Sequence, residues 1–273
     1  MTTNFLVVGG TGKTGRRVAD RLRERGLPVR ITSRCGEPPF DWGDRETWAP
    51  VLKGADAVYL TYYPDLVVPG AAADIRAFAE LAVTGGVRHL VLLSGRGEAE
   101  AEACERVVQA AGTGWTVLRC SWFAQNFSEH FLLDAVRGGE IALPAGTVTE
   151  PFLDVRDLAD VAVKVLTEAG HTGRRYELTG PRLLSFAGAA AEIAAATGRD
   201  VRYVPVSAEE YAAAAVGYGV PEDEAGALTE LFARVLDGRN ESVTRDVERV
   251  LGRPPLDFAA YARDAAATGV WTR

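Results

Sequence analysis

Short apolar runs alternate along the chain with stretches of helical periodicity, and turn residues separate the two. Continuously apolar strands of this kind are typical of a parallel sheet that helices cover on both faces. Parallel strands need crossover connections, which are nearly always right-handed, so the pattern predicts a doubly wound parallel-sheet α/β fold. The predicted strands are 5–8, 29–32, 55–60, 89–93, 115–118 and 176–179.

Helical periodicity fills the gaps between these strands. In the first helix, Val18, Ala19 and Leu22 share one face. Gly26 can adopt the left-handed conformation that ends a helix, and Pro28 forbids its continuation. The predicted helices of this part are 13–25, 45–53, 70–84, 98–111 and 156–168.

The alternation loosens after residue 120, where Gly138, Gly139 and Pro144 interrupt the pattern. We therefore expect a principal domain of residues 1–120 plus 156–180 and a smaller, mainly helical lobe of residues 121–155 plus 181–273. In this lobe the predicted helices are 185–198, 207–216, 222–237, 243–251 and 257–269, around one short strand at 201–204.

The composition is that of a globular protein, with 47% hydrophobic and 25% charged residues among 273. The net charge is −7 and the cations are scattered among acids, so we expect no direct contact with nucleic acid. Cys35, Cys104 and Cys120 are too few and too far apart for a disulfide framework or a zinc site. We expect reduced thiols, no metal, no membrane contact and a cytoplasmic location, because no targeting segment precedes the first strand.

A glycine-rich turn joins the first strand to the first helix, with Gly9, Gly12 and Gly15 at its key positions. The amide groups that open a helix, together with the helix dipole, suit a diphosphate. We expect Gly9 to serve the turn, Gly12 the approach of the phosphate, and Gly15 the close packing of helix on strand. A strand-to-helix turn without a ligand is the alternative.

Ser33 and Arg34 follow the second strand, where enzymes that use NAD place an acid for the ribose. A guanidinium binds a 2′-phosphate in a fork, whereas a carboxylate would repel it, so the sequence predicts NADP(H). An ordinary surface role is the alternative for Arg34 and for Lys13. The predicted cofactor-binding residues are Gly9, Gly10, Thr11, Gly12, Lys13, Thr14, Gly15, Ser33, Arg34, Trp42, Thr61 and Tyr62.

Aromatic residues follow the fifth strand, where Trp122, Phe123, Asn126 and His130 are predicted to line a substrate pocket. Their mixture of apolar surface with one or two polar groups suits a flat or aromatic substrate. A buried aromatic cluster that joins the two lobes explains the same composition equally well.

Besides the glycine turn and Arg34, the chain contains the segments Leu118–Phe127, Asp154–Ala159, Tyr176–Pro181 and Gly252–Phe258. Taken together, these motifs resemble the NmrA-like family of atypical short-chain dehydrogenases. The likeness spans nearly the whole chain and implies a Rossmann fold that binds NADP(H), with a small C-terminal substrate lobe. It also implies one of two activities: reduction of quinones, azo dyes or small carbonyl compounds, or cofactor sensing without chemistry. Cys120 departs from the pattern, which commonly has proline there.

The proton-donating Tyr-x-x-x-Lys pair of ordinary short-chain dehydrogenases has no counterpart in the helix after the fourth strand. Ser94 matches their serine position, and alignment with the family pattern puts Glu98 and Glu102 at the two positions of the pair. Acids in the first turns of a helix also complement its dipole, which is the simpler explanation of both glutamates. Asp157 is likewise interpreted as a helix N-terminal acid.

A different proton donor is then needed, and Ser94 and Tyr63 are the predicted catalytic residues. Tyr62 and Tyr63 follow the third strand at the edge where ligands of open α/β sheets bind, although paired tyrosines beside a proline also occur as packing.

The leading hypothesis is an NADPH-dependent reductase of a small, aromatic or quinonoid carbonyl compound that acts as a monomer or homodimer. The alternatives are a non-catalytic NADP(H) sensor that binds a regulatory protein, or an isomerase or cyclase that uses the same cofactor site.

Overall fold

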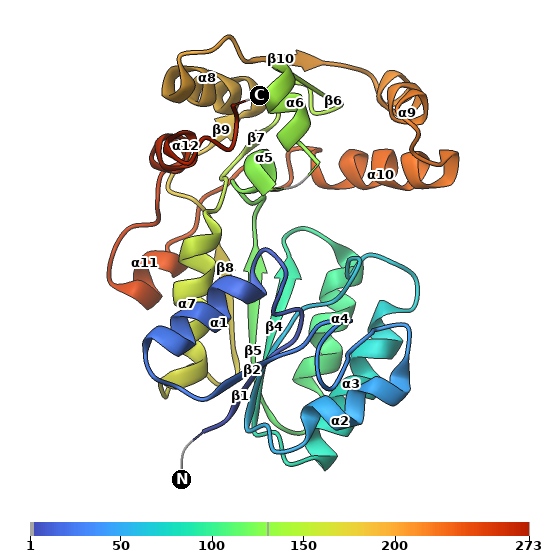
Figure 1. Ribbon diagram of the computed structural model, residues 1–273, viewed down its shortest axis with the longest axis vertical. Coiled ribbons are helices and arrows are strands. Elements are labelled where there is room, and N and C mark those ends of the chain that lie inside the picture. Colours follow the sequence, from blue (N-terminus) through green and yellow to red (C-terminus); the bar gives the residue numbers. More distant parts are fainter. Residues whose placement is uncertain (1–2, 130, 273) are drawn as a thin grey trace. The chain divides into compact units, whose positions relative to one another are not determined.

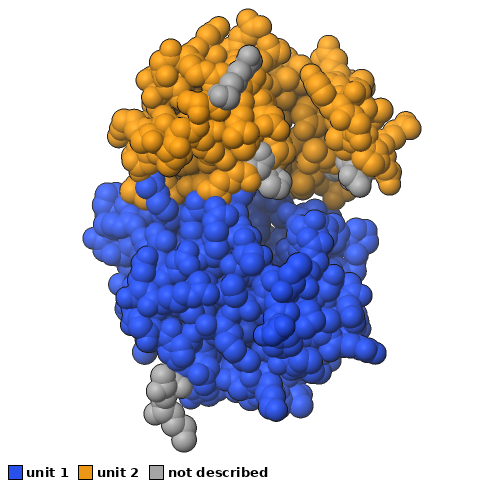
Figure 2. All heavy atoms as spheres, in the orientation of Figure 1, with its two compact units in different colours: residues 1–120, 155–178, 245–254 blue, residues 121–154, 179–244, 255–273 orange. Residues whose placement is uncertain are grey.

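The computed structural model describes residues 3–129 and 131–272. It divides into two compact units, shown in Figure 2: unit 1 comprises residues 1–120, 155–178 and 245–254, and unit 2 comprises residues 121–154, 179–244 and 255–273. Neither unit is continuous in sequence, because the chain returns twice to unit 1.

Unit 1 is built on a six-stranded parallel sheet in the order β2-β1-β3-β4-β5-β8. All six strands coincide with predicted apolar runs, so the predicted doubly wound α/β fold is confirmed. The strands are β1 Phe5–Val7, β2 Val29–Ile31, β3 Ala57–Leu60, β4 His89–Gly95, β5 Gly114–Cys120 and β8 Arg174–Leu178.

Helices cover both faces of this sheet (Figure 1). On one face, a core that includes Trp48, Phe78 and Val108 joins three helices to the buried side chains of the strands. These helices are α2 Trp48–Leu52, preceded by the 3-10 turn Arg45–Thr47, α3 Ala71–Thr84 and α4 Ala99–Gln109. The other face carries α1 Gly15–Glu24, α7 Val155–Thr167 and α11 Asp246–Leu251.

The first helix ends as its sequence predicts. Gly26 has a φ of +68°, and the amide of Leu27 donates to the carbonyl of Leu22 at 3.0 Å. This left-handed turn satisfies carbonyl groups that the end of the helix leaves without partners.

One part of the predicted domain division is wrong: residues 245–254 belong to unit 1, although we assigned all of 181–273 to the second lobe. The reason is a set of ionic contacts that hydrophobic patterning does not reveal. The backbone amide of Glu177 donates to Asp246 at 2.8 Å. Arg253 pairs with Asp157 and Asp160, both at 2.6 Å, which ties the end of this segment to α7.

Unit 2 contains an aromatic core that includes Phe127, Phe152, Phe186 and Phe258. The indole of Trp271 is buried and donates to the carbonyl of Phe127 at 2.8 Å. The helices of unit 2 are α5 Asn126–Glu129, α6 Leu133–Gly138, α8 Phe186–Thr197, α9 Ala208–Gly217, α10 Glu222–Val235 and α12 Phe258–Ala267.

Two small two-stranded sheets complete unit 2. Strand β6 Glu140–Leu143 pairs in parallel with β10 Arg202–Pro205, and β7 Thr149–Glu150 pairs antiparallel with β9 Leu184–Ser185. Only β10 corresponds to a predicted strand. The others are short and depend on partners far away in the sequence, so their local pattern carries little signal.

Candidate active site

The loop between β1 and α1 brings glycines into close contact with neighbouring atoms. Gly9 has a φ of +69°, and its carbonyl accepts the amide of Gly12 at 2.9 Å. A Cβ atom on Gly15 would lie 2.3 Å from the oxygen of Gly9, and one on Gly10 would lie 2.4 Å from Cβ of Ile31. The turn therefore packs backbone on backbone, as the predicted roles of Gly9 and Gly15 require.

The amino end of α1 carries neither a cap nor an acid. Thr14 makes no side-chain capping bond, and the first turn contains no acidic residue. By contrast, Ser185, Ser207 and Asp257 cap α8, α9 and α12 with their side chains. Because the first amide groups of a helix lack intrahelical acceptors, the uncapped end of α1 suits an anion.

We expect Gly15→Ala to destabilise the protein, although glycine-to-alanine changes in helices normally stabilise. The added methyl group would clash with the Gly9 carbonyl, so the melting temperature should fall and the free energy of unfolding should drop by about 1–3 kcal/mol. Gly226→Ala in α10 is the matched control: its Cβ meets no atom within 4 Å, so a gain of up to about 1 kcal/mol is expected. Thermal unfolding of both variants tests this expectation. A higher melting temperature for Gly15→Ala would contradict the close contact between Gly15 and Gly9.

Arg34 lies in the loop after β2, with its side chain exposed. Its guanidinium carbon is 5.5 Å from the ring centroid of Tyr63, which is 67% exposed and follows β3. Across residues 3–129 and 131–272, Arg34 forms no hydrogen bond or ion pair. The loops after β2 and β3 thus present a cation and an aromatic ring side by side, and Ser33 is the half-buried neighbour of this pair. Tyr63 therefore lies beside the predicted 2′-phosphate site, which favours a cofactor contact over its predicted catalytic role.

Trp42 and Tyr62 are engaged in packing. The indole of Trp42 is buried and donates to the carbonyl of Thr61 at 3.1 Å. The hydroxyl of Tyr62 donates to Asp74 at 2.8 Å, and burial together with that carboxylate raises the pKa of Tyr62 to about 12. Thr61 donates to the carbonyl of Val8 at 2.9 Å and so braces the glycine turn. The indole N–H of Trp42 and the hydroxyl of Tyr62 therefore already have acceptors within unit 1.

A buried ionic network lies at the carboxyl ends of β4 and β5. Arg119 is 7% exposed and binds Glu105 through two nitrogens, at 2.9 and 2.6 Å. Ser94 donates its hydroxyl proton to the same carboxylate at 2.7 Å. Glu177 lies 3.4 Å from Arg119. Because Ser94 has a single proton and gives it to Glu105, this arrangement leaves it none for a substrate.

Sequence reasoning missed Glu105 and Arg119, although two signals were present. Arg119 interrupts an apolar strand, and Glu105 follows Ala101 and precedes Val108 at helical spacing on the buried face of α4. A buried cation needs an anion, and these two positions provide the pair.

The two glutamates at the positions of the missing pair have different surroundings. Glu102 lies 3.2 Å from Arg119 and is half-exposed. Glu98 is partly buried, immediately before α4, and a Cβ atom on Gly95 would lie 2.1 Å from its carboxylate oxygen. Glu102 is therefore an ion-pair partner of Arg119, whereas the carboxyl group of Glu98 lies against the backbone of Gly95.

The predicted substrate residues Trp122, Phe123 and Asn126 belong to unit 2. Trp122 packs at right angles against Phe186, with ring centroids 5.2 Å apart. Phe123 forms an isolated bridge with Leu153, and Asn126 begins α5. His130 lies outside the described residues. These contacts place Trp122 in an aromatic cluster, and the pocket assignment stays a prediction.

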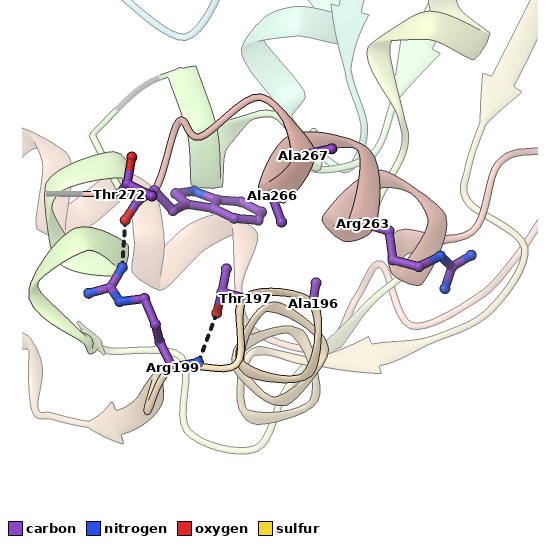
Figure 3. A pocket seen from close by; sticks show the side chains of 8 residues that line it. Ala196, Thr197, Arg199, Arg263, Ala266, Ala267 and Thr272 are labelled. Atoms are coloured by element: carbon purple, nitrogen blue, oxygen red, sulfur yellow. Dashed lines mark hydrogen bonds between the residues drawn. The ribbon is translucent and has the colours of Figure 1, made fainter.

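A hollow in unit 2 lies between α8, α12 and the segment after α12 (Figure 3). Arg199 lines it and donates to the carbonyls of Trp271 and Arg137 at 2.5 and 2.6 Å. Its guanidinium is therefore used to fasten the segment after α12 to the rest of unit 2.

No group of three or more His, Cys, Asp or Glu side chains gathers as metal ligands would, in the part of the chain that the structure describes. None of the helices there is both long enough and apolar enough to cross a membrane.

Comparisons with known proteins point to one group. No family model matches the chain. The chain is 34% identical to the NAD(P)H azoreductase of Xenophilus azovorans, with 96% of this chain and 98% of that protein covered. It is 30% identical to agroclavine dehydrogenase of Claviceps fusiformis, with 95% and 96% covered. Among solved structures, an NADPH-dependent quinone oxidoreductase from Escherichia coli, complexed with NADPH, superposes with a TM-score of 0.77 at 22% identity, with 95% and 99% covered.

Proposed function

Because this chain belongs to the NmrA-like family of atypical short-chain dehydrogenases and is an NAD(P)H-dependent reductase, we propose that it reduces a small aromatic or quinonoid compound with NADPH. The reaction proceeds without a Tyr-x-x-x-Lys pair, since α4 contains neither tyrosine nor lysine. Unit 1 binds the cofactor and unit 2 contributes the substrate lobe.

The guanidinium of Arg34, which has no ionic partner within the described residues, is the reason to expect a preference for NADPH over NADH. It stands exposed after β2, stacked near Tyr63, and no carboxylate within the described residues neutralises it. A 2′-phosphate supplies the anion that this cation lacks, and a planar guanidinium binds it through two hydrogen bonds.

The glycine turn supports the same proposal at the other phosphates. A side chain at Gly10 or Gly15 would collide with neighbouring atoms, and the amino end of α1 has neither a side-chain cap nor an acidic residue in its first turn. When bound, the nicotinamide supplies the hydride. The chain's own task is to hold the diphosphate on the turn, anchor the 2′-phosphate on Arg34 and orient the acceptor.

Two observations support an aromatic acceptor. Trp122 and Phe131 remain partly exposed in unit 2, with ring centroids 6.1 Å apart, and together offer a surface for a flat ring. The relative from Xenophilus azovorans is named for azo reduction, a reaction of aromatic dyes. Azo dyes, quinones and aromatic ketones are therefore the compounds to test.

The experiment mixes purified protein with NADPH and a panel of these three acceptors and follows the loss of nicotinamide absorbance. We expect turnover with at least one acceptor and a lower KM for NADPH than for NADH. Tight NADPH binding without any turnover would favour the sensor alternative. Product formed without net oxidation of NADPH would favour an isomerase or cyclase.

A further inference from the structure

The sequence alignment puts Glu98 at the position where ordinary short-chain dehydrogenases have their proton-donating tyrosine. It follows β4 by three residues and immediately precedes α4, and its carboxyl group lies against the backbone of Gly95. A side chain at Gly95 would occupy the same space, since its Cβ would be 2.1–2.5 Å from both carboxylate oxygens and their carbon. The absence of a side chain at Gly95 is thus what allows Glu98 to fold over the carboxyl end of β4.

Glu98 does not act as a helix cap. It occupies the N-cap position of α4, yet its side chain makes no capping hydrogen bond. No ion pair or side-chain hydrogen bond of Glu98 occurs within the described residues. Capping hydrogen bonds, which N-cap acids commonly form, therefore do not account for the inward position of this carboxyl group.

The surroundings of Glu98 favour its protonated form. The charged groups that act on it are Asp65, in the loop after β3, and Glu100, on its own helix, and both are acids. Burial first, and then these two carboxylates, raise the pKa of Glu98 to about 8. Near neutral pH the side chain is therefore mainly a carboxylic acid with a proton to give.

We propose that Glu98 is the general acid of the reductase and takes the place of the missing tyrosine. This inference rests on the proposed function. The acceptor takes a hydride, with its two electrons, from NADPH, and its oxygen takes the proton from the Glu98 carboxylic acid. The products are NADP⁺, an alcohol or hydroquinone, and the Glu98 carboxylate, which solvent then reprotonates.

Two of the other hydroxyl groups at this edge already donate their protons to carboxylates. Ser94 donates its proton to Glu105, and Tyr62 donates its proton to Asp74. Tyr63 is largely exposed beside Arg34, at the predicted 2′-phosphate site. Glu98 combines a labile proton with a position at the end of β4.

The test compares two acceptors that differ in their need for a proton. A naphthoquinone needs both hydride and proton, whereas a cationic triarylmethane dye becomes neutral on accepting hydride alone. Glu98→Gln keeps the shape of the protonated side chain, but its amide group cannot give up a proton to the acceptor. We expect its kcat with naphthoquinone to fall about 100-fold, the usual scale of general acid catalysis, while its dye reduction and NADPH affinity stay unchanged.

The pH profile provides a second readout. With naphthoquinone, wild-type kcat should decline as the pH rises above about 8, because the acid form of Glu98 is lost, and Glu98→Gln should lack this decline. The control Glu80→Gln makes the same charge change at an exposed position of α3, whose side chain is not among the groups that act on Glu98, and should behave as wild type.

The two proposals fail in different ways. Two results would show that the general-acid role is wrong while the reductase proposal survives, provided that wild-type protein oxidises NADPH. In the first, Glu98→Gln reduces naphthoquinone as fast as wild type does. In the second, Glu98→Gln loses its activity toward naphthoquinone and toward the dye by the same factor. If wild-type protein reduces neither acceptor, the proposed function itself fails, and the role of Glu98 fails with it.

Discussion

Arg34→Glu is expected to weaken NADPH binding by about 100-fold or more, because it removes charge-assisted hydrogen bonds to the 2′-phosphate and sets a carboxylate against it. NADH has no phosphate there, so its affinity should change by less than about 3-fold. The dissociation constants of both cofactors, measured by titration calorimetry, give the ratio directly. The wild-type preference for NADPH should become a preference for NADH.

Arg76→Glu provides the matched control for this experiment. Arg76 is an exposed arginine of α3, and its replacement makes the same change in net charge within unit 1. It should leave the ratio of the two dissociation constants as in wild type. Equal losses of NADPH affinity in the two variants would mean that Arg34 acts through overall charge, and the 2′-phosphate site would have to be sought elsewhere.

Arg119→Met is expected to destabilise unit 1 by about 3 kcal/mol or more, because Glu105 would remain buried without its cation. Glu105 is 2% exposed and can reach no solvent to compensate. Equilibrium urea unfolding, followed by the fluorescence of the buried Trp42 and Trp48, measures the loss. Arg88→Met, which removes an exposed partner of Asp56, should shift the unfolding midpoint little.

The double variant Glu105→Leu/Arg119→Met separates a missing partner from a missing ion pair. With both charges replaced by apolar groups, much of the lost stability should return, since the cost of a buried unpaired charge disappears. A double variant as unstable as Arg119→Met alone would show that packing around the arginine stem, and not the orphaned carboxylate, is responsible.

The sheet and its helices could be predicted from the sequence because each element carries a local signal. Buried parallel strands are apolar throughout, as in Leu90–Leu93, and the first helix has both a buried face and a Gly26 stop. The glycine turn could be predicted equally well, because Gly9 and Gly15, which lie in contact in the fold, are only a few residues apart in the sequence.

The rest depended on contacts between distant residues. Arg253 binds Asp157, which lies 96 positions earlier in the sequence. This contact ties residues 245–254 to unit 1, although the helical pattern on either side of them belongs to unit 2. Trp42 is predicted beside the cofactor from its place after the second strand, and the pattern does not reveal that its indole also packs in the core against Trp48. Periodicity shows which face of an element is buried, and it does not show which polar groups meet there.

The interleaving of the two units has a consequence for protein engineering. Because each unit is assembled from three stretches of the chain, neither can be expressed alone by cutting the gene at a single point. Deleting everything after residue 244 would remove α11 from unit 1 and α12 from unit 2 at once. Changes of specificity are therefore expected to come from point substitutions and loop exchanges, while grafting of a whole lobe from a relative would require several junctions to match simultaneously.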